Sequence, residues 1–319
     1  MYRAGVWGIA VAATVTWFAA DAVAETTFVQ GATRPGHTTF QVMTGYANII
    51  NREVPEVTVT VQQSGASVAT TQLVESNRIQ AGPVGNNAPY DAWRGLGKFE
   101  GKKTENIRTW TPIYTYGAQL IVPADSDIHD WTDLEGKRVG VGAVGSGGEM
   151  TNRLILETVG VGYDKIDEYQ IGHGEMVDGF KNGSLDAIIE TTGMPTAGVV
   201  ELNTTRDIRI VPLTEAQIAA VSAKSKLVSG GIVPAGTYEG IDKDIPIIVG
   251  YTINLIHKDI EDDLVYTMTK AIWENTEELG NVHPSQRSLN PEWIELGLLP
   301  IAPLHPGAER YYREQGWIN

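Results

Sequence analysis

Residues 139–150 read VGVGAVGSGGEM, and this stretch contains the order of elements that decides the fold. The β-branched residues over 138–141 favour a short strand. Ser146 and Glu149 then form a capping box, in which each residue can satisfy a backbone amide at the beginning of a helix. A strand, a glycine-rich turn and a helix in this order are typical of an α/β protein.

The glycines of this stretch also fit the dinucleotide pattern G-x-G-x-x-G, at Gly140, Gly142 and Gly145. That pattern requires its first glycine after the strand and an acidic residue about 20 positions later, at the end of the next strand. Here the first two glycines fall within the expected strand. The acidic residues at 164, 167 and 168 precede the next strand instead of ending it. We therefore do not interpret the loop as a pyrophosphate site of a redox enzyme.

Three other loops share the chemistry of this one. They read RPGHT at 34–38, SGAS at 64–67 and TTGMP at 191–195, and each follows an expected strand. Open α/β sheets bind ligands at the carboxyl ends of their strands, and the beginning of a helix offers free amides to an anion. The sequence therefore predicts that four loops, two from each half of the chain, converge on one cleft that holds a small polar molecule with a carboxylate.

Strand and helix patterns alternate along most of the remaining chain. Strands are expected at 27–30, 57–61, 118–122, 138–141, 187–190, 208–211 and 245–256, and helices near 40–50, 67–77, 149–159, 175–182, 196–202 and 264–279. This alternation predicts an α/β fold with largely parallel sheets. Long β-rich runs near 114–122 and 249–256 would carry the chain between two α/β lobes. We expect lobe I over 25–116 plus 251–319 and lobe II over 117–250.

The first residues are typical of an export signal. Arg3 precedes an apolar run over 6–20, and A-x-A at 22–24 forms a cleavage site, so residues 1–24 are interpreted as a signal peptide. An uncleaved membrane anchor is the alternative. The chain has no cysteine, which suits an oxidising periplasm and excludes thiol catalysis and thiolate zinc sites. Its net charge of −15 opposes binding to nucleic acid or anionic lipid.

Motifs for chemistry are absent from the sequence. The six histidines, at 37, 129, 173, 257, 283 and 305, show no metal-ligand spacing. Val144 replaces the first glycine of a G-x-S-x-G hydrolase elbow around Ser146, and Asp130 replaces the glycine of a calcium loop. We expect no catalytic residue, no metal and no cofactor. An exported α/β enzyme remains an alternative.

Four segments together carry a resemblance to a known family. They are PLHPGAERYYREQGW at 303–317, DLEGKRVGVGAVGSGGE at 133–149, QSGASVATTQLVESNRIQ at 63–80 and DIPIIVGYTINLIHKDIEDDLVYTMTKAIWEN at 244–275. The chain resembles the extracytoplasmic solute-binding proteins of the TAXI branch of TRAP transporters. The resemblance implies a type II periplasmic binding protein fold of two lobes joined by two crossover segments. It also implies delivery of solute to TRAP permease subunits, without ATPase activity. A small carboxylate such as glutamate, glutamine or 2-oxoglutarate is the implied ligand.

The chain departs from this family pattern at three places. It has Gly36-His37-Thr38-Thr39 where the family usually has G-T-Y-Y, so an aromatic wall is lost. Gly148 replaces a frequent threonine. Asn87 stands where an aspartate is usual, which removes a negative charge from the expected cleft.

The expected binding residues come from both lobes. They are Thr33, Arg34, His37, Thr38, Ser64, Ser67, Asn86, Asn87 and Tyr90 in lobe I, and Ser146, Gly147, Thr191 and Thr192 in lobe II. Arg34 can clamp a carboxylate, although an exposed loop arginine is the alternative. The expected partners are a small carboxylate and TRAP permease subunits, with an ABC importer as the alternative. No nucleic acid partner is expected, and the protein is expected to be a monomer.

Overall fold

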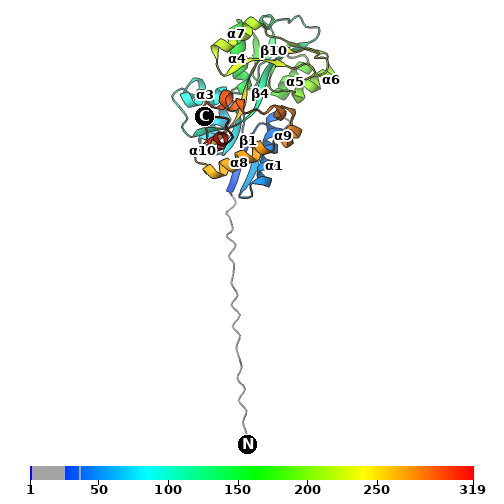
Figure 1. Cartoon of the computed structure of the whole chain (residues 1–319). Coiled ribbons are helices and arrows are strands. Elements are labelled where there is room, and N and C mark those ends of the chain that lie inside the picture. The colour runs from blue at the N-terminus through cyan, green and yellow to red at the C-terminus, as the bar shows by residue number, and fades with distance from the viewer. Residues whose placement is uncertain (2–25, 36) are drawn as a thin grey trace.

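A computed structural model of the chain describes residues 1, 26–35 and 37–319 (Figure 1). Apart from Met1, the expected signal peptide lies outside these residues. Within the described ranges, no helix combines the length and apolar character needed to cross a membrane.

The strands of the two halves join in one mixed sheet. They are β1 (Thr26–Ala32), β2 (Val57–Gln63), β3 (Ala81–Gly85), β4 (Ile107–Pro123), β5 (Arg138–Gly140), β6 (Asp167–Tyr169), β7 (Ala187–Gly193), β8 (Ile208–Val211), β9 (Val228–Val233) and β10 (Ile245–His257). Their order is β2-β1-β3-β10-β4-β7-β5-β6, while β8 pairs with β4 and β9 with β10. β1 is parallel to β2 and β3, and β5 is parallel to β6 and β7.

Two long antiparallel strands connect the halves. β4 has 17 residues and β10 has 13, and the two pair with each other from Ile107 to Gly117. In addition, β10 pairs with β3 and β9, and β4 pairs with β7 and β8. The expectation of largely parallel sheets is thus right for the outer strands and wrong for the centre. The difference arises because one strand carries the chain into the second half and the other carries it back.

Helices cover the sheet on both sides (Figure 1). They are α1 (Thr38–Glu53), α2 (Ser67–Glu75), α3 (Asn87–Arg94), α4 (Gly147–Val159), α5 (His173–Lys181), α6 (Ala197–Thr205), α7 (Glu215–Lys224), α8 (Asp262–Glu274), α9 (Thr276–Val282) and α10 (Pro306–Glu314). The single helix expected over 264–279 is divided at Asn275, whose Nδ2 donates to Ala271 O at 2.8 Å. Asparagine favours such helix ends because its side chain competes for backbone groups.

The buried apolar residues form separate cores in the two halves. One core takes residues from 28–116 and 253–312 together with Leu227, and Trp110 is its largest buried side chain. The other two lie between 118 and 248 and surround Trp131 and Phe180. Separate cores in the two halves permit the halves to move against each other. The lobe boundaries at 116/117 and 250/251 stay a prediction.

Candidate functional site

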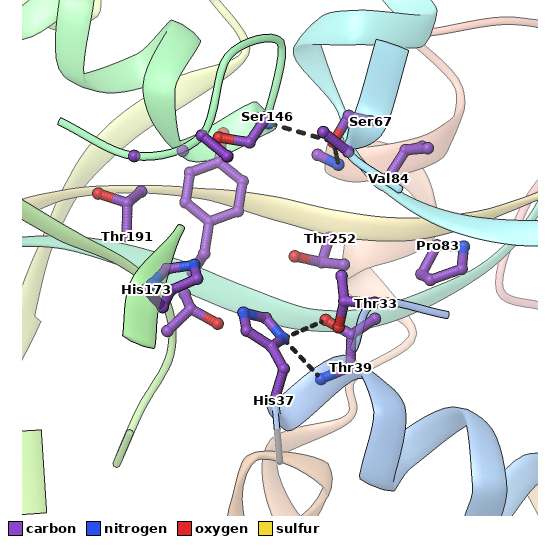
Figure 2. Close-up of a pocket in the computed structure, with 18 of the residues that line it drawn as sticks. Thr33, His37, Thr39, Ser67, Pro83, Val84, Ser146, His173, Thr191 and Thr252 are labelled. Atoms are coloured by element: carbon purple, nitrogen blue, oxygen red, sulfur yellow. Dashed lines mark hydrogen bonds between the residues drawn. The ribbon is translucent and has the colours of Figure 1, made fainter. Parts of the chain in front are cut away.

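A cavity of about 260 Å³ lies between the two halves (Figure 2). β1, β2, β5 and β7 end at its wall, and α1, α2, α4 and α5 begin there. The cavity therefore occupies the carboxyl edge of the parallel strands of both halves, which is the usual ligand position in open α/β sheets.

Part of the expected binding set lines this cavity. The lining members are Thr33, Arg34, His37, Ser67, Ser146, Gly147, Thr191 and Thr192. They come from all four of the loops singled out in the sequence. Figure 2 shows Ser146 and Thr191 on one side of the cavity, and Ser67 and Thr33 on the other.

The other members of the expected set lie outside the cavity wall. Thr38 lines an adjoining cavity of about 270 Å³. Ser64 is buried, and its Oγ donates to Ala32 O at 3.2 Å. Asn86 is buried and donates from Nδ2 to Leu227 O at 2.9 Å. The ring of Tyr90 packs against the guanidinium carbon of Arg94, 3.7 Å from the ring centroid.

Asn87 joins the two halves beside the cavity. Its Nδ2 donates to Gly147 O at 2.9 Å and to Thr151 Oγ1 at 3.3 Å. An aspartate would place a carboxylate oxygen against the same carbonyl, with no proton to donate. Asn87, where the resembled family usually has an aspartate, thus supplies a hydrogen bond between the halves.

Backbone groups of the two halves also meet directly. Ser67 Oγ accepts hydrogen bonds from Gly85 N at 3.0 Å and from Gly147 N at 3.1 Å (Figure 2). Val68 N donates to Gly145 O at 3.1 Å. Gly85 and Gly147 approach so closely that a Cβ on Gly147 would lie 2.7 Å from Gly85 Cα. The structure therefore has the two halves closed around the cavity.

Four helix N-termini give the wall its electrostatic character. His37, Ala66, Ser146 and Gly172 are the N-cap residues, and all four line the cavity. A helix N-terminus carries partial positive charge and amide donors, so four of them around one space favour an anion.

The capping box predicted for α4 is half right. Ser146 Oγ accepts from Glu149 N at 3.0 Å, as expected. The Glu149 carboxylate does not reach back, because it is buried and accepts from Arg153 Nε and Tyr163 OH, both at 3.0 Å. The amide that a capping-box carboxylate would occupy, Ser146 N, donates instead to Ala143 O at 3.0 Å.

Charged side chains of the wall have one sign. Among the described lining residues, Arg34 is the only arginine, and none is Lys, Asp or Glu. In a chain of net charge −15, a wall without carboxylates is a local reversal of the overall field. The adjoining cavity holds the carboxylates of Asp178, Glu190 and Glu201.

Two histidines face each other across the cleft. The rings of His37 and His173 lie 4.7 Å apart between centroids (Figure 2). His37 Nδ1 accepts from Thr39 N at 3.2 Å. Burial, with the nearby His173 and Arg34, holds the pKa of His37 well below its ordinary value. His37 is thus neutral, with its proton on Nε2.

The pKa of His173 is shifted in the opposite direction. Its Nδ1 lies 2.5 Å from Glu190 Oε2. Burial acts to lower the pKa of His173, but the charge and hydrogen bond of Glu190 outweigh it, and the net pKa is raised above 6.5. A histidine of this kind contributes stability that is complete below its unfolded pKa and is lost as the pH rises through the folded pKa.

Glu190→Gln is expected to lower the pKa of His173 below that of an ordinary histidine. The amide removes the charge that favours the imidazolium, so burial is then unopposed. NMR titration of the labelled imidazole in both proteins measures this change. A His173 pKa that is the same in the variant as in the parent would contradict the assigned pair.

Several lining residues were not identified from the sequence. Tyr114, Tyr116 and Thr252 belong to the connecting strands β4 and β10, and Asn152 lies on the second turn of α4. His173 is the first residue of α5. A signal for His173 was present, because it follows β6 as the other loops follow their strands. The short polar strand DEY at 167–169 hid that order.

Comparison with known proteins gives one matching family and several similar folds. A profile of the NMT1-like family matches residues 31–316. The fold is similar to the alkanesulfonate-binding protein SsuA from Xanthomonas axonopodis pv. citri, at 13% identity and a TM-score of 0.52 over 91% of this chain and 83% of that one. It is also similar to SsuA from Escherichia coli, at 12% identity and a TM-score of 0.50 over 90% of this chain and 83% of that one. A third similar structure is the substrate binding protein of an amino acid ABC transporter, at 13% identity and a TM-score of 0.50 over 84% of this chain and 99% of that one.

At such identities the similarity shows the fold alone. That fold is the one of type II periplasmic binding proteins, and the predicted fold class is confirmed.

Proposed function

The chain belongs to the NMT1-like family, and on this premise we propose that it is a periplasmic solute-binding protein. It captures a small carboxylate between its lobes and delivers it to a membrane importer. The observation that carries this proposal is the cavity wall, in which four helix N-termini and Arg34 surround a space, and no lining residue that the structure describes is Asp or Glu. Such a wall stabilises a small anion through amide donors and one positive charge.

Closure of the lobes is the proposed mechanism of capture. Ser67 and Asn87 of the first lobe both bond to Gly147 of the second, and these bonds require the closed arrangement. A solute that contacts loops of both lobes stabilises the closed state relative to the open one. The solute undergoes no reaction, so the protein is expected to release it intact.

Two classes of importer have separate support. The similar solved structures include a binding protein of an ABC transporter, which favours an ATP-driven importer. The tail at 303–317 and the loop at 133–149 resemble the TAXI branch, which favours a TRAP permease driven by an ion gradient. Uptake by cells carrying each candidate permease separates the two, because an uncoupler abolishes TRAP transport while ATP depletion abolishes ABC transport.

A cognate carboxylate is expected to stabilise the protein in a thermal-shift screen. At 100 times its dissociation constant, a ligand that binds only the folded state adds about 2.7 kcal/mol to the free energy of unfolding. The screen covers organic acids and amino acids, and the amide or methyl ester of each acid serves as the control that lacks the carboxylate charge. If no anion of a broad panel raises the unfolding temperature, carboxylate capture is contradicted.

A further inference from the structure

We propose that the solute is an organic anion without an ammonium group, so that the cavity takes 2-oxo acids or dicarboxylates and rejects the corresponding amino acids. This inference rests on the proposed function and names the chemical class of its solute. It follows from how the polar groups of the wall are already used.

Two polar side chains of the wall, Ser67 and Asn152, already have hydrogen-bond partners within the protein. Ser67 Oγ accepts from both Gly85 N and Gly147 N, which uses both of its lone pairs. Asn152 Oδ1 accepts from Thr191 Oγ1 at 2.7 Å, and its Nδ2 donates to Val141 O at 3.1 Å. Ser67 can therefore only donate to a solute, and one lone pair of the Asn152 oxygen is already used.

The N-cap side chains of His37 and Ser146 also have partners within the protein. His37 Nδ1 accepts from Thr39 N, so its neutral ring presents Nε2–H as a donor. Ser146 Oγ accepts from Glu149 N, and its hydroxyl proton is free to donate. Together with the Arg34 guanidinium, these groups form a wall of donors, which matches the oxygens of carboxylate and keto groups.

Buried carboxylates near the cavity lie outside its reach. Glu149 is engaged by Arg153 and Tyr163, as described above. Glu190 has an unpartnered Oε1, but it lines the adjoining cavity and lies behind His173. The packed rings of His37 and His173 stand between the two spaces, because both residues line both cavities.

An ammonium group in this cavity would lose its water without gaining a counter-charge. A cation that is buried without a negative charge beside it is unfavourable by more than a neutral group, while a keto oxygen at the same place accepts from the wall. We therefore expect discrimination against amino acids even though their carboxylates are identical.

The test is isothermal titration of the purified protein with matched pairs: 2-oxoglutarate and L-glutamate, oxaloacetate and L-aspartate, pyruvate and L-alanine. The 2-oxo acid of the pair that binds is expected to bind at least about tenfold more tightly than its amino acid. If the amino acid binds equally or more tightly, the inference is overturned while carboxylate capture stands. If no member of any pair binds, and the wider acid panel is silent too, the proposed function fails and the inference fails with it.

A variant separates the proposed cause from general effects of the fold. Thr33 Oγ1 is buried at the wall without a hydrogen-bond partner, so this position tolerates a new polar group. Thr33→Asp supplies the missing negative charge and is expected to bring the 2-oxo acid to amino acid affinity ratio close to one. The matched control Thr33→Asn has the same shape without the charge, and it is expected to keep the parent ratio. An unchanged ratio in Thr33→Asp would overturn the explanation from the missing negative charge.

Discussion

Gly147→Ala is expected to weaken solute binding by about 100-fold, because apparent affinity falls in proportion to the population of the closed state. A Cβ at this position would lie 2.7 Å from Gly85 Cα and 3.2 Å from Gly85 N, and neither backbone atom can move aside as a flexible side chain could. The open state separates these residues, so the solute-free protein is expected to keep its unfolding temperature. Titration calorimetry and thermal unfolding measure the two quantities.

Gly85→Ala provides the reciprocal experiment from the other lobe. Its Cβ would lie 2.8 Å from Gly147 Cα, at the same contact. We expect the same loss of affinity, and the double variant to be little worse than either single one, since both remove one closing contact. Parent-like affinity in both single variants would show that closure does not bring these backbones together.

Arg34→Ala is expected to weaken carboxylate binding by about 10- to 100-fold, the scale of a hydrogen bond to a charged group. Arg34 lines the cavity beside the first turn of α5, where its guanidinium fills the space that a Cβ on Gly174 would take. Arg34→Lys is expected to recover only part of the affinity, because an ammonium cannot make the paired bonds of a guanidinium. Titration calorimetry with the tightest acid of the panel measures both.

Arg78→Ala is the control for overall charge. Arg78 is exposed and follows α2, at the end of the lobe opposite the carboxyl edge of β3, so its removal changes the net charge equally without touching the cavity. Parent-like affinity is expected. If Arg34→Ala also binds like the parent, Arg34 is an ordinary exposed loop residue and not a clamp.

Local chemistry explains what the sequence could predict. The strand over 208–211 matches β8 residue for residue, and Ser146 caps α4 as expected. β-branched runs and capping residues act over a few positions, so they can be read along the chain. The four loops at the cavity were predicted for the same reason.

Long-range pairing explains what the sequence could not predict. Tyr114 and Thr252 reach the cavity because β4 and β10 pair in antiparallel register across the centre of the sheet. Ser64 was expected at the site, yet its hydroxyl is taken by Ala32 O and Thr70 Oγ1. Whether a hydroxyl faces a ligand or the neighbouring strand depends on partners that are distant in sequence.

The crystal structure of the protein with the tightest acid of the panel tests the central claim most directly. The account predicts the solute in the cavity between the lobes, with its carboxylate against Arg34 and the first turns of α2 and α4, and with Gly85 and Gly147 in contact. A solute bound on an outer surface, with the loops at 64–67 and 146–148 apart, would contradict the account.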